Sequence, residues 1–157
     1  MSCSQSRIGV AGKALALIGL LLLAAPSLAA AQTIKHRAEN DVPVVMTEVA
    51  RLQSYTEIHL STLTPIVGVC WTLSGPDSPY LLAAGVRYKF IDGDYIDYCP
   101  NRINYNVGER MVLRFAPLPG GINEFHLVEG EGGEHQLIDP TSSQGIGYWN
   151  FLHIKLN

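Results

Sequence analysis

Apolar and polar residues alternate along most of the chain from Val44 onward, and this pattern limits the fold more than any other feature. In RMVLRF, Met111, Leu113 and Phe115 share one parity, while the two arginines take the other. TEIHL, VRYKF and EFHLV repeat the arrangement, and no stretch after residue 31 keeps apolar residues at helical spacing for three turns. Period-two alternation is typical of half-buried β-strands. We therefore predict an all-β antiparallel sandwich or barrel of about seven or eight strands, and we favour the sandwich.

Turn residues separate these runs. Asp92-Gly93 predicts a two-residue hairpin turn, because glycine tolerates the positive φ that such turns need. Ala83 to Gly85 is expected to join YLL to VRYKF. IVGVCWTL, residues 66–73, is apolar at nearly every position and predicts a central strand buried on both faces.

The last run, YWNFLHIKL, changes parity along its length. Leu152, Ile154 and Leu156 alternate, but Trp149 and Phe151 fall on the opposite parity. A β-bulge would explain the change. The alternative is an exposed aromatic patch for a partner.

The first 31 residues have the layout of a secretory signal peptide. Arg7 and Lys13 give a positive start, an apolar run spans Ala14 to Ala25, and small residues precede an expected cut before Gln32. This run is short against the ~20 residues that cross a bilayer, so we expect no membrane insertion after cleavage, with a retained anchor as the alternative. We therefore expect a periplasmic or secreted protein. It should have three parts: a signal peptide (1–31), a polar lead-in (32–43) and a β-sandwich domain (44–157).

Charge argues against nucleic acid as a partner. The whole chain carries a net charge of −3. Two of its eleven basic residues and none of its fourteen acidic ones lie in the signal peptide, so the remainder is more acidic still. A binder of nucleic acid concentrates Lys and Arg on one face, whereas here they are few and scattered.

Signal cleavage would remove Cys3 and leave Cys70 and Cys99 as a pair. In an oxidising compartment we expect a structural disulfide between them. The alternative is a redox-active pair. Such pairs usually have Cys-x-x-Cys spacing, which this pair does not have.

The C-terminal half resembles a set of uncharacterised, exported bacterial domains, some of which precede thioredoxin-like domains. The matching segments are MVLRFAPLPGGINEFHLVEGEGG, YWNFLHIKL and the hairpin segment LLAAGVRYKF. The resemblance implies an immunoglobulin-like β-sandwich. It supplies no catalytic residues. It carries over no redox role, because no Cys-x-x-Cys follows, and the cysteine pair is not part of the matched pattern.

Three glutamates and two histidines crowd into FHLVEGEGGEH, residues 125–135. We interpret this stretch as a β-hairpin with a glycine-rich, solvated turn. The alternative is a metal site built from His126, Glu134 and His135, since imidazoles and carboxylates are zinc ligands. The preferred interpretation requires no cofactor.

Two further segments suggest binding. DGDYID carries three aspartates, fewer oxygens than the six to eight that calcium takes, so we interpret it as a turn. DYIDYCPNRINYNVG is rich in tyrosine, which offers stiff amphipathic contact area. Its tyrosines could instead pack against the edge of the core. The candidate binding residues are Tyr95, Tyr98, Arg102, Tyr105 and Trp149.

These features favour a small exported binding module, not an enzyme, that contacts a protein or an envelope component. An inhibitor or immunity protein would be a special case. The chain contains no Gly-x-Ser-x-Gly nucleophile motif. Two alternatives remain: a metal-binding or metal-dependent hydrolytic protein that uses residues 125–135, and a carbohydrate-binding module. The latter would use Tyr95, Tyr98, Tyr105 and Trp149.

Overall fold

The computed structural model describes residues 30–39, 41–139 and 148–157. The predicted signal peptide lies outside these residues except for Ala30 and Ala31, which begin the first strand. Within the described ranges, no helix is both long and apolar enough to cross a membrane. The elements, in chain order, are β1 (Ala30–Arg37), β2 (Val44–Arg51), β3 (Thr56–Thr62), β4 (Ile66–Val69), β5 (Tyr80–Ala83), β6 (Val86–Asp94), β7 (Ile103–Tyr105), β8 (Arg110–Phe115), β9 (Glu124–Val128), α1 (Gly130–Ile138) and β10 (Phe151–Lys155).

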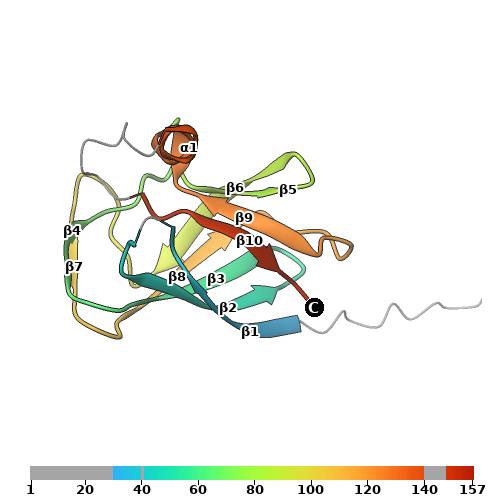
Figure 1. Cartoon of the computed structure of the whole chain (residues 1–157), viewed down its shortest axis with the longest axis horizontal. Coiled ribbons are helices and arrows are strands. Elements are labelled where there is room, and N and C mark those ends of the chain that lie inside the picture. Colours follow the sequence, from blue (N-terminus) through green and yellow to red (C-terminus); the bar gives the residue numbers. More distant parts are fainter. Residues whose placement is uncertain (1–29, 40, 140–147) are drawn as a thin grey trace, which may run out of the picture.

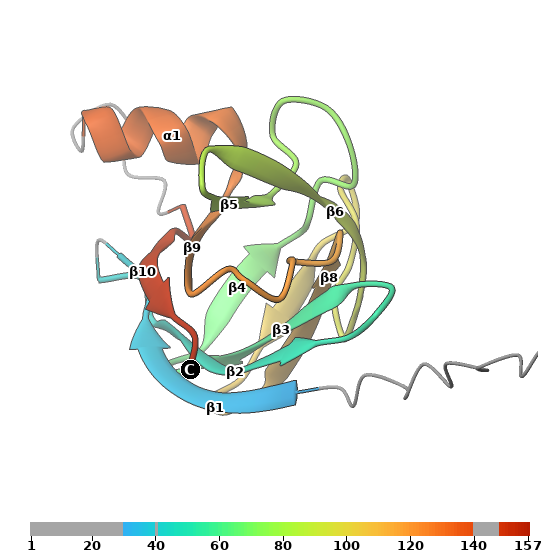
Figure 2. The same cartoon turned by 90° about the vertical axis from the view of Figure 1, so that its right-hand side faces the viewer.

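Eight strands form one antiparallel sheet in the order β1-β2-β3-β8-β6-β5-β9-β10. The sheet curls around a common interior, so that its two edge strands approach each other (Figure 2). Gln32 of β1 joins them: its Nε2 donates to the Lys155 carbonyl at 3.3 Å, and its Oε1 accepts from the Asn157 amide at 2.8 Å. β4 and β7 pair separately as a two-stranded ribbon at one end of the molecule (Figure 1).

The fold is mostly β and antiparallel, as predicted, but it includes one helix, and the main sheet is nearly closed into a barrel and is not a clear sandwich. Alternation tells which residues face inward. It does not tell whether the inward faces belong to two stacked sheets or to one curled sheet, because both arrangements bury every second residue. Here hydrogen bonding continues from strand to strand across β8, β6, β5 and β9, which keeps the sheet in one piece.

Most of the residues predicted to point inward line the core, but Val86 of β6 was predicted to point inward and is 53% exposed. Met111, Leu113 and Phe115 of β8 are fully buried, as are the inward residues of β3. Burying one such side chain contributes roughly 1.5–3 kcal/mol. The largest fully buried side chains are Phe115, Phe125, Phe151, Met46, Ile58, Leu60, Leu81, Met111, Leu113, Leu127, Ile154 and Val44.

The parity change in the last run is a β-bulge, as predicted. The register of β10 against β9 shifts between Phe151 and Ile154, and both of these side chains are buried. His153 lies within this bulge and has a left-handed φ of 54°. Trp149 is also buried, against Trp71, with ring centroids 5.3 Å apart.

Two strand predictions were wrong. The apolar run at residues 66–73 is not a central strand, because β4 belongs to the small ribbon and Val67 is 78% exposed. Asp92-Gly93 is not a hairpin turn, because β6 continues through it and pairs with β8. Gly93 serves a close approach instead: a Cβ there would lie 2.4 Å from the Val112 carbonyl oxygen. The Ala84-Gly85 turn between β5 and β6 forms as expected, with both residues at positive φ.

The polar segment 32–43, expected to precede the fold, contains most of β1, and so the barrel begins before Val44. β1 is an edge strand on the outside of the barrel, with an alternating pattern of exposed and half-buried residues. Its polar composition suits that position, because only one of its faces covers the core. Ile34 is the residue of β1 that packs against the buried cluster.

The glycine-rich stretch after β9 was predicted to be a hairpin turn. This prediction was wrong, because residues 130–138 form helix α1. The glycines allow close docking. A Cβ on Gly130 would lie 2.6 Å from the Asp77 backbone, and one on Gly133 would lie 2.6 Å from the Asn150 amide oxygen. The Asn150 side chain donates to the Gly133 carbonyl at 3.0 Å, which fixes the helix against the start of β10.

Candidate functional site

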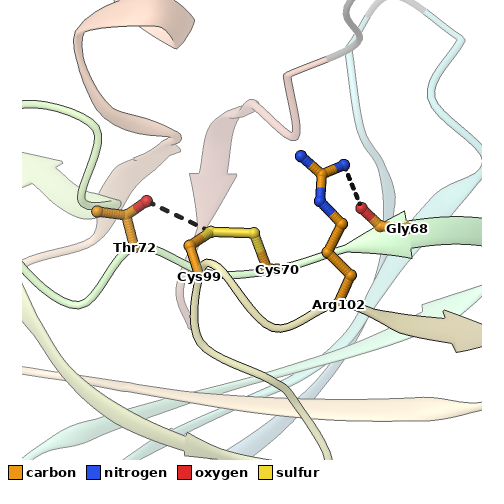
Figure 3. Close-up of a disulfide and its surroundings, with 5 residues drawn as sticks. All are labelled: Gly68, Cys70, Thr72, Cys99 and Arg102. Atoms are coloured by element: carbon orange, nitrogen blue, oxygen red, sulfur yellow. Dashed lines mark hydrogen bonds between the residues drawn. A yellow bond between two sulfur atoms is a disulfide. The ribbon is translucent and has the colours of Figure 1, made fainter.

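A disulfide fastens the tyrosine-rich segment to the ribbon, as predicted. Cys70 follows β4, Cys99 precedes β7, and their Cα atoms lie 5.0 Å apart (Figure 3). Backbone hydrogen bonds flank the bridge: the Trp71 amide donates to the Asp97 carbonyl at 2.8 Å, and the Cys99 amide donates to the Trp71 carbonyl at 3.1 Å. The segment between β6 and β7 is therefore held at its middle.

Tyr95 is the exposed aromatic residue of this segment. It directly follows β6, is 71% exposed and has a left-handed φ of 59°. This backbone conformation is costly for a residue other than glycine and persists only where the surroundings impose it. The hydroxyl of buried Tyr105 donates to the Tyr95 carbonyl at 2.8 Å and so holds the conformation.

Tyr95 borders a hollow of about 420 Å³. Ile103 and Tyr105 of β7 and Arg110 at the start of β8 also line it, together with Glu109. We call these five residues the Tyr95 surface. Its walls combine aromatic and aliphatic carbon with one group of each charge, which is the composition of a recognition site.

Tyr105 and Glu109 of the Tyr95 surface keep their ordinary charge states at neutral pH. Burial raises the pKa of Tyr105 to about 12, and the charges of Asp97 and Glu109 add to this effect. The Asn106 backbone amide and side chain donate to the Glu109 carboxylate at 2.8 and 3.1 Å, which lowers the pKa of Glu109. Arg110 contacts Nδ1 of the buried His59. Neither Tyr105 nor Glu109 is thus poised to exchange a proton near pH 7.

A second hollow, of about 320 Å³, lies beside β4 and the disulfide. Arg102, Glu129 and Trp149 line it with residues of the 66–70 segment. The Arg102 guanidinium donates to the Gly68 carbonyl at 3.1 Å (Figure 3). The Glu129 carboxylate accepts from the Trp149 amide at 2.6 Å, but burial raises the pKa of Glu129 to about 7.

The structure divides the five predicted binding residues among three places. Tyr95 and Tyr105 line the first hollow, and Arg102 and Trp149 line the second. Tyr98 packs against Phe90 in the core, with ring centroids 6.5 Å apart, and its hydroxyl accepts from the Gly93 amide at 3.0 Å. Since Tyr105 and Trp149 are also buried, the four aromatic residues of the carbohydrate hypothesis do not form one exposed platform.

The predicted metal ligands do not form a group with one another. Glu134 lies on α1, where its carboxylate accepts from the Tyr80 hydroxyl and the Arg87 guanidinium. Arg87 in turn lies over the Tyr80 ring, 4.6 Å from its centroid. These contacts attach α1 to β5 and β6, while His135 is exposed on the helix. His126 instead lies beside Glu124 and His153 on the outer face of β9 and β10.

Two of the three aspartates of DGDYID, Asp92 and Asp94, pair with arginine. Asp92 accepts from Arg114 at 3.0 Å, and Asp94 also accepts from Arg114. Glu57 of β3 binds the same guanidinium at 2.9 Å. Together with Arg114, these carboxylates form an ion-pair network.

Several residues of the candidate sites were missed by sequence reasoning. Glu109 and Arg110 follow a turn, and nothing in their spacing marks them as neighbours of Tyr95. Glu124 was detectable in principle, because it shares its outward parity on β9 with His126. His153 was not detectable, since only the bulge in β10 places it beside Glu124 and His126.

The chain matches no family model, no curated protein and no solved structure. The resemblance to exported bacterial domains therefore remains a prediction in all but the antiparallel β architecture. The fold defines the protein as a small antiparallel β-protein whose main sheet is nearly closed into a barrel and whose loop before β7 is fastened by a disulfide.

Proposed function

We propose that this protein is an exported, non-catalytic binding module whose Tyr95 surface contacts a protein partner in the cell envelope or outside the cell. The observation that carries the proposal is the exposed, strained Tyr95, held by the Tyr105 hydroxyl. Backbone strain maintained by a buried hydrogen bond tends to occur where a side chain must be presented in one orientation. A tyrosine side chain has few rotatable bonds, so it binds with little loss of entropy.

The chemistry of the surface favours a protein partner. Tyrosine and arginine are enriched among the residues that dominate protein–protein binding, and both are present here. The hollow between Tyr95, Ile103 and Tyr105 can receive one apolar side chain of a partner.

Binding is favoured over catalysis at this surface by the protonation states of its groups. General acid–base catalysis works best with a pKa near the operating pH. Tyr105 keeps its proton and Glu109 stays ionised at neutral pH. Export is supported by the signal-like first 31 residues, by the cysteine pair and by the resemblance to exported domains.

The test compares capture from an envelope extract of the source organism by three immobilised proteins. These are the wild type, Tyr95→Asn and Val86→Ala. Asparagine tolerates the left-handed region, so Tyr95→Asn removes the ring without a folding penalty. Val86 is 53% exposed at the β5–β6 turn and serves as the matched control.

We expect one partner protein that the wild type and Val86→Ala retain equally. Tyr95→Asn should retain it at least about tenfold less, as when an aromatic anchor of a binding site is lost. Equal retention by all three proteins, or no retained partner, contradicts the proposal. Binding to a glycan array that Tyr95→Asn abolishes would instead assign the surface to carbohydrate.

A further inference from the structure

Three potential metal ligands converge on the outer face of β9 and β10. Glu124 and His126 lie two residues apart on β9 and point to the same side, and His153 comes from β10. One ligand atom from each of the three side chains lies within 4.8 Å of the other two. None of the three belongs to the Tyr95 surface.

The bulge in β10 produces this convergence. Its register shift between Phe151 and Ile154 gives His153 a left-handed φ of 54°, a strained conformation for histidine. Two interactions hold it there. The His153 amide donates to Nδ1 of His126 at 3.1 Å, and Nδ1 of His153 lies 2.7 Å from a Glu124 carboxylate oxygen.

We propose that Glu124, His126 and His153 bind a divalent transition-metal ion of the zinc–copper class. Two imidazoles and one carboxylate form a nitrogen–oxygen ligand set that suits these ions, whereas Mg²⁺ and Ca²⁺ prefer oxygen alone. Water would complete the coordination. The imidazole rings stand edge to face, 76° apart, with centroids 4.8 Å apart, so both can direct a nitrogen to one point.

Small movements of exposed side chains complete the site. Tetrahedral zinc with bonds of about 2.0–2.1 Å keeps its ligand atoms about 3.3 Å apart, so the widest pair must close by about 1.5 Å at most. The side chains of His153 and Glu124 are 70% and 42% exposed and can make this adjustment. Nδ1 of His126 accepts the His153 amide, and this nitrogen has one lone pair, so an ion bound there must replace that hydrogen bond.

The positive charge of Lys155 disfavours cation binding at this site. Lys155 pairs with Glu124 across the two strands, and its positive charge acts on the Glu124 carboxylate. An ammonium group near the site weakens cation binding by electrostatic repulsion. Replacing Lys155 with glutamine should therefore tighten metal binding.

The experiment is isothermal titration of the protein, purified without a polyhistidine tag, with Zn²⁺ and separately with Mg²⁺. We expect equimolar Zn²⁺ binding, tighter in Lys155→Gln, and no Mg²⁺ binding at the same concentration. In His126→Gln and His153→Asn, Zn²⁺ binding should weaken at least about tenfold. Asparagine accepts the left-handed φ at position 153, and circular dichroism checks the fold of each variant.

His135→Gln is the matched control, because His135 is exposed on α1 and away from this group. It should bind Zn²⁺ as the wild type does. Absence of Zn²⁺ binding by the wild type overturns the proposal, and so does a loss in His135→Gln equal to that in His153→Asn. Equal binding of Mg²⁺ and Zn²⁺ would show nonspecific attraction to the acidic surface and would overturn it as well.

Discussion

Glu129 illustrates how a single half-buried carboxyl can make the stability of the fold depend on pH. Its carboxylate accepts one hydrogen bond, from the Trp149 amide, and its own amide donates to Asn150 at 3.0 Å. Burial is the main cause that raises the pKa of Glu129 to about 7 in the folded protein, and the charge of Asp77 adds to it. The unfolded chain binds the proton more weakly, so ionisation favours unfolding.

Stability should therefore fall as pH rises from about 4.5, the ordinary glutamate pKa, to about 7. Glu129→Gln keeps an acceptor for the Trp149 amide and removes the ionisation. We expect the variant to exceed the wild type in free energy of unfolding by about 2–3 kcal/mol at pH 8, and by less than about 1 kcal/mol at pH 5. Urea denaturation at both pH values measures this difference.

The control is Glu131→Gln, because Glu131 is exposed in the first turn of α1. It should show the same change between pH 5 and pH 8 as the wild type. If Glu129→Gln also follows the wild type at both pH values, the raised pKa is wrong.

Tyr95 carries strain that stability measurements can detect. Because its left-handed φ is unfavourable for tyrosine, Tyr95→Asn should leave the free energy of unfolding unchanged or raise it by up to about 1 kcal/mol. Thermal denaturation by circular dichroism is the measurement. A loss of more than about 1 kcal/mol would mean that the exposed ring stabilises the fold and is not kept for binding.

At the scale of elements, α1 shows what glycine does in this chain. Gly130 has a φ of 63° and lies against the Asp77 backbone, and the Glu131 amide donates to the Pro76 carbonyl at 2.9 Å. Glycine is a poor helix former, so the stretch carries no helical signal of its own. The helix forms because tertiary contacts hold it, above all those of Glu134 with Tyr80 and Arg87.

Gly130→Ala should destabilise the protein by about 2–4 kcal/mol, since the new methyl group adds a steric clash to an unfavourable φ. Gly85→Ala separates the two effects. Gly85 also has a positive φ, of 77°, but no atom lies close to where a Cβ would be. Gly85→Ala should therefore lower the free energy of unfolding by only about 1 kcal/mol. Equal losses in the two variants, measured by urea denaturation, would show that α1 is not closely docked.

The disulfide stabilises the loop that carries the Tyr95 surface. Cys70 and Cys99 are 29 residues apart, which corresponds to roughly 3–4 kcal/mol in the chain-entropy description of cross-links. The double variant Cys70→Ser and Cys99→Ser should lose about this amount of unfolding free energy. Treatment of the wild type with a reductant should lower its free energy of unfolding by the same amount. The same treatment should leave the free energy of unfolding of the double variant unchanged. A stable reduced protein would mean that the bridge has little structural role.

At the scale of the whole molecule, closure of the barrel depends on few contacts. Gln32 connects β1 with the end of β10, whereas the interior pairs, such as β3 with β8, have continuous ladders. The seam between β1 and β10 is therefore the weakest part of the wall, and it should open before the rest unfolds.

Gln32→Ala should speed amide hydrogen exchange in β1 and β10 and leave β3 and β8 unchanged. The loss of two partly exposed hydrogen bonds corresponds to about 1–2 kcal/mol. Thr33→Ala, at the neighbouring exposed position, is the control and should exchange as the wild type does. Uniform acceleration across all strands would instead indicate a loss of global stability.

The sequence by itself determined the antiparallel strands, their inward residues such as Met111 and Phe125, the bulge in the last strand and the cysteine pair. These follow from local alternation and from the number of cysteines, and neither depends on distant neighbours. Tertiary structure decided that one sheet curls into a barrel, that residues 130–138 form a helix and that His126 meets His153. Each of these results from contacts between segments far apart in the chain, where packing overrides what local pattern and propensity indicate.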